Sequence, residues 1–160
     1  MSTTNDVCGK TWSWVQTGAV LAGLAVALGA FGAHGLDGVL AKKYSGQTRV
    51  VAGEEVPASR KYMADFKTAA EYQMTHALGI IAVGLLLRFQ CTHILGAAGW
   101  CLLWGIVLFS GSLYALVLTG VTKLGMITPI GGVLFLVGWT LLAIGGARAC
   151  SPAPAPQPTA

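Results

Sequence analysis

Long apolar runs separated by short polar segments dominate this chain. Four of the runs come close to the roughly 20 residues that an α-helix needs to cross a bilayer core of about 30 Å. The pattern therefore predicts an all-α fold, a four-helix transmembrane bundle that occupies residues 14–148. The predicted spans cover residues 14–33, 72–88, 94–118 and 126–147.

A polar segment leads directly into the second predicted span. No Pro or Gly interrupts residues 60–78, and apolar residues recur there every three or four positions, which predicts one continuous helix. Its first part, residues 60–70, is expected to be a short amphipathic helix at the membrane surface. Thr68, Tyr72 and His76 share one face of this helix because they are spaced four residues apart.

Three segments lack the pattern of a span. Residues 1–13 are polar, residues 37–59 mix charges of both signs with little apolar content, and residues 151–160 are rich in Pro. The first is expected to be a tail, the second a long solvated loop and the third a disordered tail. None of the three offers enough apolar surface to form a core of its own.

Composition supports a membrane protein and excludes other classes. The chain is 54% hydrophobic and 10% charged, with a mean hydropathy of +0.67, whereas soluble domains carry about 25% charged residues. The net charge of +4 is scattered and forms no basic patch with interleaved aromatics. The lipid bilayer is therefore an expected partner and nucleic acid is not. The cysteines form no C-x-x-C pair and predict no disulfide framework: Cys8, Cys91, Cys101 and Cys150.

Basic residues are more numerous on the side of the long loop. The positive-inside rule counts Lys and Arg near the spans, and it places this side in the cytoplasm. The basic residues on the long-loop side are Lys42, Lys43, Arg49, Arg60, Lys61, Lys67 and Lys123. Those on the other side are Lys10, Arg88 and Arg148.

Small residues recur at helical spacing within the predicted spans. In lipid, such residues let two helix backbones approach closely, and this packing replaces the hydrophobic driving force of soluble proteins. We therefore predict that they pack against neighbouring helices, against copies of the same chain or against a larger membrane complex. The predicted packing positions are Gly23, Ala27, Gly29, Gly111, Gly131, Gly132 and Gly138.

Four sequence blocks, one in each predicted span or at its edge, resemble a known family. The blocks are ALGAFGAHGL (27–36), FKTAAEYQMTHALGI (66–80), LFSGSLYAL (108–116) and TPIGGVLFLVGWTLLAIGGAR (128–148). Together, and in this order, they resemble the YgdD-like membrane proteins, the family known as DUF423. The resemblance implies a small four-span protein of the bacterial inner membrane, with no established activity and no established catalytic residues. The chain departs from the family pattern in its longer first loop and its Pro-rich tail.

Five polar residues are predicted to gather at one membrane face. His34 ends the first span, while Glu71, Tyr72, Gln73 and His76 open the second. Ionisable groups at membrane depth are costly and often mark a site. Three hypotheses follow: polar contacts that fix helix packing, a proton relay through Glu71, His76 and His34, and a haem or metal held by the two histidines, with Glu71 as a further metal ligand. The first is favoured, and no cofactor or metal is predicted.

The sequence carries no signature of an enzyme. It contains no G-x-G-x-x-G and no P-loop, and no histidine lies near the serines of the third span, so no catalytic residue is predicted. The favoured hypothesis is a structural or accessory membrane protein that packs with partner helices or with itself. The alternatives are a small proton-linked transporter or channel component that uses Glu71 and His76, and a haem- or metal-binding membrane protein.

Overall fold

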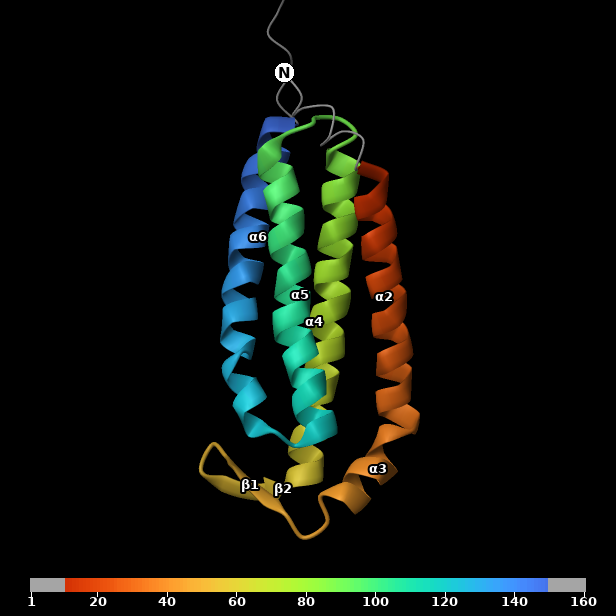
Figure 1. Cartoon of the computed structure of the whole chain (residues 1–160), viewed down its shortest axis with the longest axis vertical. Helices are drawn as coiled ribbons and strands as arrows, with labels where there is room; N and C mark the ends of the chain where they lie inside the picture. The colour runs from red at the N-terminus through yellow and green to blue at the C-terminus, as the bar shows by residue number, and fades with distance from the viewer. Residues whose placement is uncertain (1–10, 150–160) are drawn as a thin grey trace, which may run out of the picture.

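The computed structural model describes residues 11–149, and most of them are helical (Figure 1). Four long helices lie side by side: α2 (Thr11–His34), α4 (Ala58–Leu86), α5 (His93–Thr119) and α6 (Thr128–Ala149). The predicted Pro-rich tail lies outside the described residues, as does most of the predicted N-terminal tail. Residues 11–13 of that tail begin α2.

Within the described residues, three stretches are long and apolar enough to cross a membrane. They are Ser13–His34, His93–Thr119 and Thr122–Ala147. The helix α4 is not among them, because charged residues in its first half and polar residues at its middle, including Gln73 and His76, lower its mean hydropathy. Three of the four long helices thus have the length and apolar composition of membrane spans.

The helix α4 is continuous from Ala58 to Leu86, as the absence of Pro and Gly in its first two-thirds predicts. The predicted amphipathic segment and the predicted second span are therefore parts of one helix. Its 29 residues extend over roughly 43 Å at about 1.5 Å per residue, which exceeds an apolar layer of about 30 Å.

The long helices are arranged in a row, in the order α6, α5, α4, α2 (Figure 1). The helix α2 packs along α4 and lies at the edge of the row, although Trp14 reaches α5 and contacts Trp100 edge-on at 5.4 Å between ring centroids. One apolar cluster fills the space between α4, α5 and α6, with Ile80, Leu102 and Phe135 near its centre. Among residues 11–149, α4 is therefore the main neighbour of α2, and the opposite side of α2, which includes Val20 and Val26, is exposed.

The segment 37–59, predicted as a solvated loop, is ordered secondary structure. It contains most of α3 (Leu36–Lys43) and a hairpin of two antiparallel strands, β1 (Thr48–Val51) and β2 (Glu54–Pro57). The prediction of an all-α fold is thereby corrected, because a two-stranded sheet is present. The hairpin turns at Ala52 and Gly53, whose positive φ angles of 52° and 88° are typical of a type I′ turn.

The spacing of apolar residues explains why this segment folds. Leu36, Leu40 and Tyr44 are four residues apart, so they share one face of α3, and all three are buried. They pack with Tyr62 and Phe66 of α4 in a second apolar cluster, which closes one end of the row of helices. The prediction of a loop was wrong because many charged residues lie among these apolar residues and mask their helical spacing.

Polar contacts also attach the segment to the end of α5. The Tyr44 hydroxyl donates to the carbonyl oxygen of Val117 at 2.9 Å, and the Lys43 ammonium donates to that of Leu118. These carbonyls belong to the last turn of α5, where no helical N–H remains to donate to them. The helix dipole also favours a cation such as Lys43 at this end. Burial raises the pKa of the Tyr44 phenol above its ordinary value, so this hydroxyl remains a donor at neutral pH.

Candidate functional site

The four polar residues at the middle of α4 face different surroundings. Gln73 and His76 are buried, with only 3% and 5% of their surface exposed. Glu71 and Tyr72 are exposed. A helix turns by about 100° per residue, so neighbours in sequence point in different directions. The candidate site therefore divides into a buried pair and an exposed pair.

Gln73 links α4 to α2. Its side-chain amide donates to the carbonyl oxygen of Leu21 at 2.9 Å. That carbonyl lies inside α2, so the bond crosses the interface between the two helices at a defined level. Interhelical hydrogen bonds in membrane proteins contribute about 0.6 kcal/mol on average and fix the alignment of two helices.

We expect Gln73→Leu to lower the free energy of unfolding by about 0.6 kcal/mol, because it removes this bond at similar volume. Glu71→Gln is the matched control, since its exposed side chain has no hydrogen-bond or ion-pair partner within residues 11–149. Both values can be measured by denaturant unfolding in detergent micelles. A loss of equal size in the control would contradict the assignment.

His76 faces α6 and forms part of a group of aromatic rings. Its ring stacks on Phe135 with 3.3 Å between centroids and an interplanar angle of 17°. Tyr72, one turn earlier, stacks on Phe109 of α5 at 4.5 Å. These rings, together with Trp139 of α6 at 6.1 Å from His76, form what we call the aromatic cluster. The cluster joins α4, α5 and α6 at one level.

One nitrogen of His76 is already engaged. Its Nδ1 lies 2.6 Å from the carbonyl oxygen of Tyr72, and because a carbonyl only accepts, Nδ1 carries the proton. Stacking on Phe135 covers a ring face. The ring neighbours of His76 on α6 are Phe135 and Trp139, and they could not be predicted from the sequence because they are far from His76 in the chain and lie in an ordinary apolar run.

Glu71 does not meet His76. The two residues are five positions apart, which separates their side chains by roughly 140° around the helix. Glu71 is exposed, whereas His76 is buried against α6. The predicted proton relay therefore lacks direct contact between these two members.

His34 lies apart from the other four residues. Gly32 packs against the Phe66 ring, so the end of α2 is level with the early part of α4. His76 is ten residues beyond Phe66, a distance of roughly 15 Å along the helix. The pair of histidines needed to hold a haem or metal is therefore not brought together. Within residues 11–149, no three His, Cys, Asp or Glu residues are placed to share a metal ion.

The predicted packing positions fall into two groups. Gly131 and Gly138 are buried where α6 touches Phe109 and Leu102 of α5. The remaining positions face away from the other described helices: a Cβ would meet nothing within 4 Å among residues 11–149 at Gly23, Gly29, Gly111 or Gly132, and Ala27 is exposed. Other small residues form the closest approach of α2 to α4, notably Gly18 and Gly84.

Comparison with known proteins identifies the chain as a member of a family of membrane proteins of unknown function. The family model described as "Protein of unknown function (DUF423)" matches residues 28–132, which confirms the resemblance inferred from the four sequence blocks. A "UPF0382 membrane protein" of Staphylococcus epidermidis is 47% identical over 131 residues, covering 82% of this chain and 92% of the relative. The "UPF0382 membrane protein YwdK" of Bacillus subtilis is 39% identical over 136 residues, covering 84% and 96%. No solved structure matches the chain significantly.

Proposed function

Because this chain belongs to the DUF423 family of membrane proteins, we propose that it is a four-span protein of the bacterial inner membrane with a structural or accessory role. In this proposal the protein acts by packing one side of α2 against a transmembrane helix of a partner. The partner is either a larger membrane complex or a second copy of the chain.

The first part of the proposal is that α4 crosses the membrane. Between Lys67 and Arg88 the sequence contains one charged residue, Glu71, over roughly the 20 residues that a span requires. The helix packs between α2 and α5, both of which are apolar enough to cross. Leu78 and Leu85 are exposed on its outer side, 54% and 50% respectively, as expected for side chains that contact lipid.

The observation that carries the functional proposal is the open side of α2. Ala19, Gly23 and Ala27 are spaced four residues apart, which places them on one face, and all three are exposed. A Cβ at Gly23 would meet nothing within 4 Å, so none of the residues 11–149 fills the face at this position. In lipid, a face of this composition lets another helix approach closely, and α2 lies at the edge of the row where that is possible.

The test is a purification of the tagged protein in gentle detergent, with mass analysis of the proteins that elute with it. We expect a stoichiometric partner, or a dimer, with the wild-type chain. Gly23→Leu and Ala27→Leu should each lose it, because a larger side chain holds the partner helix away. Retention of the same partner by both variants would contradict the proposal.

Val133→Leu provides the matched control for this experiment. It adds one carbon to a side chain that is 58% exposed on α6, at the other edge of the row. It should therefore leave the partner bound. Thermal unfolding of all three variants shows whether they remain folded, which is expected because the α2 positions have open space around them.

A further inference from the structure

A cavity of about 450 Å³ lies at the end of the molecule where α3 and the hairpin meet the start of α4. Its charged lining residues are Asp37 of α3 and Arg60 and Lys67 of α4. Ser59 adds a hydroxyl, while Ala41 and Met63 provide apolar surface. The cavity is thus open, mixed in polarity and lined by two cations and one carboxylate.

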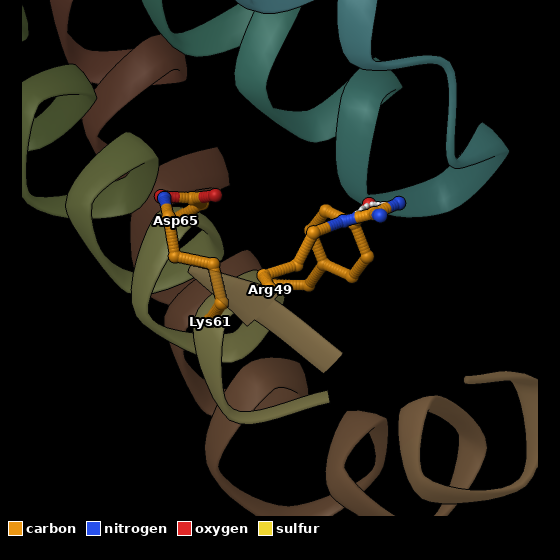
Figure 2. Close-up of polar contacts among 4 residues, drawn as sticks. Arg49, Lys61 and Asp65 are labelled. Carbon is orange, nitrogen blue, oxygen red and sulfur yellow. Dashed lines mark hydrogen bonds and ion pairs between the residues drawn. The ribbon is translucent and has the colours of Figure 1, made fainter. Parts of the chain in front are cut away.

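The two cations in the cavity have no partner. Neither Arg60 nor Lys67 makes a hydrogen bond or an ion pair with its side chain inside the described part of the chain. Neighbouring cations are engaged: Lys61 pairs with Asp65, and Arg49 donates to the Tyr62 hydroxyl at 2.9 Å (Figure 2). Of the three cations of α4, Arg60 and Lys67 are therefore the two without a partner among residues 11–149, and both line the cavity.

The proposed crossing of α4 places the cavity at the level of the lipid headgroups. Lys67 directly precedes the part of α4 that we assign to the bilayer, and Arg60 lies two turns further out. On the neighbouring helix, Gly32 packs against Phe66, so the apolar helix α2 ends close to the same level. Figure 1 shows α3 and the hairpin gathered at this end, beyond the four long helices.

We propose that this cavity binds the headgroup of a monoanionic phospholipid such as phosphatidylglycerol. The Arg60 guanidinium and the Lys67 ammonium bind the phosphate oxygens, as charge-assisted hydrogen bonds favour. The Asp37 carboxylate accepts hydrogen bonds from headgroup hydroxyls. Two cations and one carboxylate leave a single net positive charge, which matches one anionic phosphate rather than a zwitterionic headgroup. The inference rests on the proposed crossing of α4, but it does not depend on what binds the open side of α2.

The test measures lipid binding to the full-length chain in detergent micelles, by native mass spectrometry with added phosphatidylglycerol or phosphatidylethanolamine. We expect the wild-type protein to prefer phosphatidylglycerol. The double variant Arg60→Gln/Lys67→Gln should bind it about 10- to 30-fold more weakly, because each cation near the headgroups contributes about a factor of five. Unchanged binding by the double variant would overturn the proposal.

Two further experiments distinguish lipid binding in this cavity from nonspecific electrostatic attraction of anionic lipid and from binding of free phosphate. Lys123→Gln removes an exposed cation at the same end, outside the cavity lining, and should leave binding unchanged. Inorganic phosphate at millimolar concentration should not displace the lipid, because it lacks the hydroxyls and the apolar anchor. An equal loss in Lys123→Gln, or displacement by inorganic phosphate, would count against a lipid headgroup site.

Discussion

Replacing Gly131 by alanine is expected to lower the free energy of unfolding by about 3 kcal/mol, at the upper end of what overpacking usually costs. A Cβ at this position would lie 2.5 Å from the backbone nitrogen of Phe109 and 2.8 Å from its Cβ. Backbone atoms cannot move aside as a side chain can, so α5 and α6 would have to separate. That separation would also loosen the stack of His76 on Phe135, because Phe135 is on α6 and contacts Phe109 of α5.

The adjacent residue provides the control for this prediction. At Gly132 an added Cβ would meet nothing within 4 Å. Gly132→Ala is therefore expected to be neutral or to stabilise the helix by up to about 1 kcal/mol, since alanine favours the helical conformation. Unfolding in mixed micelles of mild detergent and SDS measures both variants. Equal stability of the two variants would contradict the close approach of Gly131 on α6 to Phe109 on α5.

The second large effect is expected at the contact between α2 and α4. A Cβ at Gly18 would lie 2.7 Å from the carbonyl oxygen of Ala77 and 2.9 Å from the backbone nitrogen of Ile81. Gly18→Ala should therefore destabilise the protein by about 2 to 3 kcal/mol through overpacking. The same unfolding assay applies, and increased proteolysis of α2 should accompany the loss if the helix detaches.

Gly23→Ala in the same helix is the matched control for Gly18→Ala. Its Cβ would point into open space, so we expect no loss of stability. The pair also separates the two roles that small residues have in α2, because Gly18 packs within the chain and Gly23 is proposed to pack outside it. A destabilising Gly23→Ala combined with a neutral Gly18→Ala would reverse the assignment of the two faces.

The long helices could be predicted from the sequence because burial in a helix repeats every three to four residues. The continuity of α4 followed from the absence of Pro and Gly across the polar junction. The shared face of Tyr72 and His76 followed from their spacing, and their rings stack at 5.7 Å. These features depend only on residues close together in the chain.

The role of each glycine could not be predicted in the same way. Gly131 and Gly132 are the same residue type in adjacent positions, yet one touches α5 and the other faces open space. The difference is a rotation of about 100° around α6, and it depends on where Phe109 lies. The surroundings of His76 were missed for the same reason, since its ring neighbours Phe135 and Trp139 come from another helix, α6.

The structure of the segment 37–59 was missed for a different reason. Its charges suggested a solvated loop, but Leu36, Leu40 and Tyr44 carry enough apolar surface on one face to hold α3 against α4. The hairpin depends on the Ala52-Gly53 turn, a weaker signal than the Asn-Gly pair that such turns favour. Because this segment lines the cavity, missing it also concealed the proposed lipid site.

The membrane topology of α4 decides most directly whether the protein has four spans or three. Single cysteines placed in a cysteine-free chain at Ser45, Phe89 and Lys123, all exposed, can be labelled with a membrane-impermeant maleimide in intact and lysed cells. If α4 crosses the bilayer, Ser45 and Lys123 react from one side, expected to be the cytoplasm, and Phe89 reacts from the other. If Ser45 and Phe89 react from the same side while Lys123 reacts from the opposite one, only α2, α5 and α6 cross, and the four-span account is contradicted.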